Sequence, residues 1–344
     1  MLRRLSATGT TCFLYTKPES FRTWWSSFVR TCSTPAFPSA PITALQAVDL
    51  WRRHFEQSGV TEPGHSSRYI LAHLLGAKTM GCLDQKKLSH FLTQEETERM
   101  WTLCSRRLSR MPVQYVIEEW DFRDVTLKMR PPVFIPRPET EELVELVLTD
   151  LLKERDSGPK VCLEVGCGSG AISLSLLKKI PELTAVALDQ SRDAVDLTRE
   201  NALKLSLQDR LQLHHLDVIK DADAVLRVCG RVSAVVSNPP YLYSEEMAAL
   251  DPEILRFEDP AALDGGADGL SVIRQILTLA PRVLCERGRV YLEVNPRHLG
   301  LVQRWAEENP AELSYMETRH DISGRPRFCI LQKEESKDQE MDLD

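Results

Sequence analysis

Residues 164–171 read Glu164-Val165-Gly166-Cys167-Gly168-Ser169-Gly170-Ala171, and this stretch decides the fold. It ends an apolar run at 161–165 and opens an amphipathic pattern at 171–179. Glycines at such a junction allow a tight turn and let a ligand approach the backbone closely. Asp189 ends the next apolar run, where an acid can accept hydrogen bonds from ribose hydroxyls. The stretch therefore predicts a nucleotide-type ligand at the end of a strand.

The same rhythm of strand, turn and helix continues along the chain. Helices are predicted over 138–155, 171–179 and 192–205. Strands are predicted over 161–165, 185–188, 211–216, 234–237, 289–294 and 328–331. Alternating strands and helices are typical of an α/β protein with an open, mostly parallel sheet and helices on both faces.

The glycine stretch leaves two kinds of ligand open. Gly166, Gly168 and Ala171 also fit the dinucleotide fingerprint G-x-G-x-x-G/A, and a purely structural glycine turn is a third reading. Glu164 places a carboxylate beside the loop, which favours the cationic amino-acid end of S-adenosylmethionine over a pyrophosphate. We predict contacts to S-adenosylmethionine from Asp189, Asn238 and the loop residues Gly166, Cys167, Gly168, Ser169 and Gly170.

A second motif, Asn238-Pro239-Pro240-Tyr241, follows the fourth predicted strand of the sheet. A planar amide or amine nitrogen is a poor nucleophile because its lone pair is shared with a π system. Two acceptors aimed at its N–H bonds, the Asn238 oxygen and the Pro239 carbonyl, can hold it in line with a sulfonium methyl group. The prolines stiffen the backbone, and Tyr241 offers a flat face to a flat group.

These four residues are therefore the predicted catalytic and substrate-binding site for methylation of a planar nitrogen. The motif does not select among adenine, cytosine, guanine and glutamine nitrogens. The competing structural interpretation is a proline turn after a strand, capped by Asn238.

The N-terminal part has a different pattern. Apolar residues recur at helical spacing over 42–110, and Thr93 with Glu96 predicts a capping box at a helix start. The basic end of this part (Arg106, Arg107 and Arg110) is expected to be a solvated face. Residues 114–136 alternate β-branched and aromatic residues with charges, as in a connecting hairpin.

The first forty residues resemble an organelle transit peptide. They hold five basic residues against one acid, and Ser and Thr fill thirteen positions. We expect mitochondrial import, with a disordered arm as the alternative. Subtracting the leader's net charge of +4 from −7 leaves −11 for the mature chain, which disfavours a broad nucleic-acid surface.

No run approaches the roughly 20 apolar residues of a membrane span, so the sequence indicates a soluble protein. Its nine cysteines include no C-x-x-C pair. Free thiols are the expected state, and neither a metal site nor disulfides are predicted.

Several segments together resemble the HemK/PrmC family, which methylates the glutamine of the Gly-Gly-Gln motif in peptide chain release factors. The resemblance is carried by Arg106-Arg107, Pro112-Val113-Gln114-Tyr115, Phe134-Ile135-Pro136-Arg137-Pro138-Glu139-Thr140-Glu141, residues 163–172, Asn238-Pro239-Pro240-Tyr241, Leu255-Arg256-Phe257-Glu258 and residues 262–270. Taken with the leader, the chain is most similar to the mitochondrial branch. Two departures from the family pattern occur: Asn295 and His298 replace a glycine and a glutamine, and a glycine is missing within 116–121.

The resemblance implies a seven-stranded class I methyltransferase (Rossmann-like) sheet with a small N-terminal helical domain and a connecting β-hairpin. It implies N5-methylation of glutamine in mitochondrial release factors, in the matrix, with S-adenosylmethionine as donor and no metal. Arg137 would lie near the ligand or be structural, and Asp217 would lie near the adenine or cap a turn. No membrane or nucleic-acid partner is expected.

The expected division is a transit peptide over 1–40, a substrate-docking helical domain over 41–111, a hairpin linker over 112–137, a methyltransferase domain over 138–332 and an acidic tail over 333–344. Three rivals stay open. These are a nucleic-acid amino methyltransferase, a binding module that kept the fold without activity, and a dinucleotide oxidoreductase.

Overall fold

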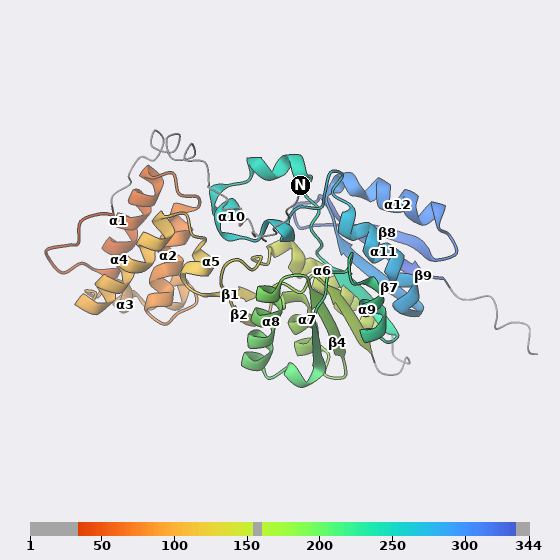
Figure 1. Ribbon diagram of the computed structural model, residues 1–344. Coiled ribbons are helices and arrows are strands. Elements are labelled where there is room, and N and C mark those ends of the chain that lie inside the picture. The colour runs from red at the N-terminus through yellow and green to blue at the C-terminus, as the bar shows by residue number, and fades with distance from the viewer. Residues whose placement is uncertain (1–33, 154–159, 335–344) are drawn as a thin grey trace, which may run out of the picture.

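The computed structural model of the 344-residue chain describes residues 34–153 and 160–334. Figure 1 shows a helical part at one end, a short hairpin beside it, and a sheet with helices on both faces. Most of the expected leader, up to residue 33, and the expected tail from residue 335 lie outside the described residues. Among the helices described, none is long and apolar enough to cross a membrane.

The sheet has seven strands in the order β5-β4-β3-β6-β7-β9-β8, which confirms the expected α/β fold. Strands β3 to β7 pair in parallel, whereas β9 is antiparallel to both β7 and β8. The strands are β3 (Val161–Val165), β4 (Thr184–Asp189), β5 (Leu211–His215), β6 (Val232–Ser237), β7 (Leu284–Glu293), β8 (Leu313–His320) and β9 (Pro326–Lys333).

Helices cover the sheet on both sides because alternate residues of each central strand face opposite layers. Cys162 of β3 belongs to the core under α6, α7 and α8, whereas Leu163 belongs to the core under α9, α11 and α12. The bounds are α6 (Pro138–Lys153), α7 (Ala171–Lys179), α8 (Arg192–Leu205), α9 (Ala222–Val228), α10 (Pro252–Phe257), α11 (Ser271–Val283) and α12 (Leu299–Glu308).

The sequence prediction missed all or part of two strands on the antiparallel side of the sheet, β7 and β8. Strand β8 was not predicted, and β7 begins five residues earlier than expected, at Leu284. Strand β8 is an edge strand with only one buried residue, Leu313, so it lacks the apolar run by which the other strands were recognised. Strand β9 extends to Lys333, one residue into the range expected for the tail.

The helical part packs around Trp51, Phe55 and Met100, none of which is exposed to solvent. Its elements are α1 (Ala44–Gln57), α2 (Pro63–Leu74), α3 (Gln85–Ser89), α4 (Gln94–Leu108) and α5 (Val113–Val116). The capping box predicted at Thr93 is present at the start of α4. Although the expected leader includes Pro35, its carbonyl accepts a hydrogen bond of 3.0 Å from the Trp101 indole of this part.

The expected hairpin over 114–136 is shorter in the structure. Strands β1 (Glu119–Phe122) and β2 (Val125–Lys128) form it, and the residues before them form the short helix α5. Tyr115 and Val116 of α5 are buried, so burial on consecutive positions suits a helical turn rather than a strand with one solvated face.

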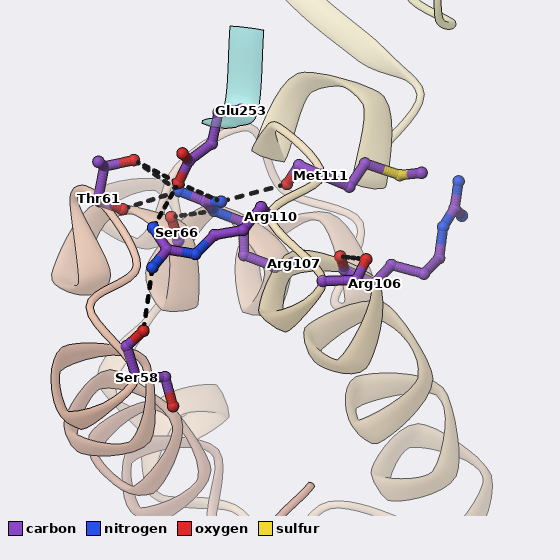
Figure 2. A network of polar contacts seen from close by, with 9 residues as sticks. Ser58, Thr61, Ser66, Arg106, Arg107, Arg110, Met111 and Glu253 are labelled. Atoms are coloured by element: carbon purple, nitrogen blue, oxygen red, sulfur yellow. Dashed lines mark hydrogen bonds and ion pairs between the residues drawn. The ribbon is translucent and has the colours of Figure 1, made fainter. Parts of the chain in front are cut away.

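The basic end of α4 is not the solvated face that the sequence suggested. Figure 2 shows Arg107 and Arg110 turned toward Glu253 of α10, while Arg106 points away. Arg107 is 3% exposed, and both guanidinium groups lie 3.3 Å from the same Glu253 oxygen, Oε1. These ion pairs tie the helical part to the segment that follows the Asn-Pro-Pro-Tyr motif.

Candidate active site

A cavity of about 740 Å³, partly open to solvent, lies at the carboxyl ends of β3, β4, β5 and β6. This edge is where open α/β sheets bind ligands. Several predicted residues line the cavity: Gly166, Gly168, Asp189, Asp217, Asn238, Pro239 and Pro240. The cavity is also lined by Val133, Phe134, Asp259, Ala261 and Ala262.

The glycine loop keeps its backbone open toward this cavity. Gly166 and Gly168 have φ angles of +79° and +54°, and a Cβ atom built on either would meet no atom within 4 Å. A Cβ on Gly170 would instead lie 2.8 Å from the Leu174 side chain. The first two glycines thus leave room for a ligand, and Gly170 allows the loop to pack on α7.

Three loop residues predicted to touch the ligand, Cys167, Ser169 and Gly170, do not line the cavity. The side chains of Cys167 and Ser169 are 3% and 2% exposed. The Ser169 carbonyl accepts a hydrogen bond of 2.9 Å from Asn201, which fixes the loop against α8. Cys167 and Ser169 therefore contribute to the packing of the loop.

Asp189 lies at the end of β4 and is fixed by the loop. Its Oδ2 accepts a hydrogen bond of 3.0 Å from the Gly168 amide, and its Oδ1 accepts one of 2.8 Å from the Ser191 amide. Burial raises the pKa of this carboxyl above its usual value, and the two amides act against that rise. Each oxygen keeps lone pairs for further donors.

Asp217 lies in a turn that borders the cavity. Its Oδ1 accepts a hydrogen bond of 2.9 Å from the Ile219 amide, so it caps a turn, and it also lines the cavity. A third acid, Asp259, lines the opposite side. No Lys or Arg occurs among the described residues that line this cavity, so its polar walls are acidic.

Glu164 does not lie where the sequence suggested. The side chain is 1% exposed and does not line the cavity. Its Oε2 accepts hydrogen bonds from the amide and hydroxyl of Ser173 in α7. Burial raises the pKa of Glu164 to about 8, with the Ser173 hydrogen bonds acting against it. The acidic character of the cavity comes from the three aspartates instead.

A second cavity, of about 520 Å³, adjoins the first. Both are lined by Phe134, Asn238, Pro239, Pro240 and Ala262. The remaining walls of the second cavity are mostly apolar and consist of Arg137, Tyr241, Leu242, Leu250, Ile254 and Leu263. The Asn-Pro-Pro-Tyr motif thus forms the boundary between the two cavities.

Asn238 is positioned by hydrogen bonds that involve two residues, Thr140 and Glu293, which the sequence analysis did not assign to the site. Its Nδ2 donates to Thr140 Oγ1 at 3.1 Å, and the Thr140 hydroxyl donates to Glu293 Oε2 at 2.8 Å. The Tyr241 hydroxyl lies 3.4 Å from Glu293 Oε1. Within the described residues, neither Asn238 Oδ1 nor the Pro239 carbonyl accepts a hydrogen bond. Glu293 ends an apolar strand at the ligand edge of the sheet, which is the signal that could have identified it.

Arg137 has a clear structural contact. Its Nη2 donates to both oxygens of Glu258, at 2.7 and 2.9 Å, and its guanidinium lies 4.6 Å from the centre of the Phe134 ring. It lines the second cavity at the same time. Arg137 therefore joins the segment before α6 to the end of α10. No cluster that could hold a metal ion occurs in the described part of the chain.

Comparison with known proteins agrees with this arrangement. The chain is 46% identical to the human MTRF1L release factor glutamine methyltransferase over 85% of its own length and 88% of the relative. The chain belongs to the release factor glutamine methyltransferase family. Other family members match over most of their length: one from Thermosynechococcus vestitus is 36% identical (70% of this chain, 78% of the relative), and one from Deinococcus radiodurans is 34% identical (79% and 92%).

Two domain models match separate parts of the chain. The PrmC N-terminal domain matches residues 46–117, which include the helices α2 to α5. The methyltransferase small domain matches residues 126–256, which include the glycine loop, Asp189 and Asn238. Glu293 lies beyond both matches, on β7.

Proposed function

We propose that this chain transfers a methyl group from S-adenosylmethionine to the side-chain nitrogen, N5, of the glutamine in the Gly-Gly-Gln motif of mitochondrial release factors. The observation that carries the proposal is the junction of two cavities at Asn238 and Pro239, where two oxygen acceptors are free. Family membership supports the choice of glutamine, since the relatives' names specify it.

The first cavity suits the donor. S-adenosylmethionine carries its methyl group on a positively charged sulfur, which makes that methyl carbon electrophilic. A wall with three aspartates and no lining Lys or Arg favours a cation and disfavours the pyrophosphate of a dinucleotide. The open backbone of Gly166 and Gly168 would hold the amino-acid end, and Asp189 the ribose hydroxyls. Leu188, Leu216 and Val218 offer apolar walls for the adenine ring.

The second cavity suits a carboxamide. The two N–H bonds of a glutamine amide would donate to Asn238 Oδ1 and to the Pro239 carbonyl, which orients the nitrogen toward the first cavity. These acceptors are set before the substrate arrives, so little reorganisation is needed as positive charge develops on the nitrogen. The Tyr241 hydroxyl is turned toward Glu293, and Tyr241 contributes to the wall of this cavity. The proton leaves the nitrogen for water after transfer.

The mitochondrial setting rests on the basic, Ser- and Thr-rich leader. Release factors of that compartment are then the partners, and the helical domain over 41–111 is the proposed docking surface. The hairpin linker (112–137) and the methyltransferase domain follow it. A protein with a net charge of −11 after import is unsuited to a broad phosphate contact, which disfavours the nucleic-acid alternative.

The experiment is transfer from labelled S-adenosylmethionine to three acceptors: a mitochondrial release factor, the same factor with alanine in place of the Gly-Gly-Gln glutamine, and duplex DNA with total RNA. We expect label in the first acceptor alone. Label in the nucleic acids alone would establish the rival activity. Absence of label from every acceptor, with tight NADH binding, would support the oxidoreductase.

A further inference from the structure

A chain of hydrogen bonds runs from the junction of the two cavities into the core. It begins at the Asn238 carboxamide, passes through the Thr140 hydroxyl at 3.1 Å, and ends on Glu293 at 2.8 Å. Thr140 lies in the first turn of α6 and Glu293 at the end of β7, and their side chains are 3% and 1% exposed. Water therefore has little access to these hydrogen bonds.

The chemistry of the three groups fixes the direction of each bond. An ionised carboxylate can only accept, so the single Thr140 proton goes to Glu293. The Thr140 oxygen then has only lone pairs to offer, and it must face the NH2 side of Asn238 rather than its oxygen. The carboxamide oxygen is left on the side away from Thr140, and Asn238 lines both cavities.

We propose that Thr140 and Glu293 are positioning residues of the methyl transfer, which hold the Asn238 carboxamide with its oxygen toward the substrate nitrogen. This inference rests on the proposed function and deepens it. A flipped carboxamide would present N–H donors to the N–H donors of the substrate amide. Such a flip removes one acceptor and places like partial charges together.

The ionisation of Glu293 controls the same orientation. Burial raises the pKa of Glu293 to about 7, with the Thr140 hydrogen bond acting against it. The other groups that act on it are Arg327 of β9, Glu139 of α6 and the Tyr241 hydroxyl. A protonated Glu293 can donate to Thr140, which frees the hydroxyl to donate to the Asn238 oxygen. Because this form is populated below about pH 7, kcat/KM should fall as the pH falls through that value.

The test compares three variants by kcat and KM for the release factor. Thr140→Val removes the hydroxyl at nearly constant volume, and Thr140→Ser keeps it. Thr318→Val is the matched control, since Thr318 bonds the Tyr315 hydroxyl on the edge strand β8. We expect Thr140→Val to lower kcat about tenfold or more with KM little changed. Thr140→Ser should recover most of that loss, and Thr318→Val should behave as the unmodified protein.

The pH profile separates positioning from mere structural support. In the unmodified protein we expect kcat/KM to drop on the acidic side of about pH 7, and Glu293→Gln should remove that drop because the side chain no longer titrates. The inference would be overturned if Thr140→Val had the kcat of the unmodified protein. It would also be overturned if kcat/KM of Glu293→Gln fell at acidic pH as it does in the unmodified protein. If the unmodified protein failed to methylate the release factor at all, the proposed function itself would fail, which is a different result.

Discussion

At the scale of single residues, the proposed methyl transfer depends on one free oxygen. The NH2 group of Asn238 donates a hydrogen bond to Thr140. Its Oδ1 has no hydrogen-bond partner among the described residues and lies at the boundary of two cavities. An unpartnered acceptor at such a place is typical of a preorganised site, because stability alone would favour a satisfied group.

Replacing Asn238 with alanine should remove that acceptor. We expect Asn238→Ala to lower kcat about a hundredfold or more, equivalent to about 3 kcal/mol, with thermal stability nearly unchanged. Steady-state methylation of the release factor measures it. Asn309→Ala is the control, because the Asn309 side chain donates to the Trp305 carbonyl at the end of α12 and lines neither cavity. Near-normal turnover in the folded Asn238→Ala protein would remove the mechanism.

The sequence located some of these residues and missed others for physical reasons. Asp189 and Asn238 follow apolar strands, so the topology of a parallel sheet alone places them at one edge. Glu164 lies one residue before the end of β3, but Ser173 of α7 binds its carboxylate. The Thr140–Glu293 contact joins residues 153 positions apart, and no local pattern reports such a pairing.

At the scale of elements, two glycines of the loop have a positive φ for different reasons. Gly166 leaves space in the cavity, and Gly170 allows close packing on α7. Gly166→Ala and Gly170→Ala both force alanine into a positive φ, which costs about 1–2 kcal/mol. We expect Gly166→Ala to weaken donor binding by about tenfold or more, because its methyl group enters open cavity space. Gly170→Ala should lower the melting temperature more, because its methyl group meets Leu174.

Calorimetric titration with S-adenosylmethionine and thermal unfolding measure the two effects. Each glycine variant is the control for the other, since both place alanine at a positive φ and therefore lose a similar free energy from backbone strain. Equal donor affinity in the Gly166→Ala and unmodified proteins would show that this part of the loop does not face the donor.

The helix α10 joins the helical part to the substrate cavity. Its Glu253 pairs with Arg107 and Arg110, Ile254 lines the second cavity, and Glu258, which follows the helix, bonds Arg137. One short helix and the residue after it thus connect the helical part, the second cavity and the segment before α6.

Removing the buried ion pair between Arg107 and Glu253 should weaken the packing of the helical part against α10. Arg107→Met leaves Glu253 buried with only Arg110 as a cation, so we expect the free energy of unfolding to fall by about 3 kcal/mol. Urea unfolding followed by tryptophan fluorescence reports it, because Trp51 and Trp101 are buried in the helical part. Arg52→Met removes two surface ion pairs, with Asp49 and Glu56, and should leave the midpoint nearly unchanged. Equal midpoints for both variants would contradict this role of Glu253.

Local patterns predicted several elements well. Helices α7 and α8 have the expected bounds, and the capping box of α4 is where Thr93 and Glu96 placed it. The failures have two causes: β8 is an edge strand with little burial, and the first residues of β7 include the exposed Glu286 and Arg287, so neither shows a recognisable apolar pattern. The inward turn of Arg107 depends on a partner 146 residues away.

At the scale of the whole molecule, each part supplies one requirement of the proposed reaction. The sheet edge presents an acidic cavity for a cationic donor, and the adjoining apolar cavity accepts an uncharged side chain. The ion pairs of Glu253 with Arg107 and Arg110, drawn in Figure 2, connect the helical part to α10, whose Ile254 lines that second cavity. A large protein substrate can then be held on one part while its glutamine reaches the other.

The most direct measurement is a crystal structure with an unreactive donor analogue and a peptide containing Gly-Gly-Gln. We predict that the glutamine side-chain nitrogen lies within about 3.2 Å of both Asn238 Oδ1 and the Pro239 carbonyl, with its lone pair toward the donor sulfur. A glutamine bound elsewhere, or an Asn238 oxygen turned to Thr140 with its NH2 group toward the substrate, would contradict the account.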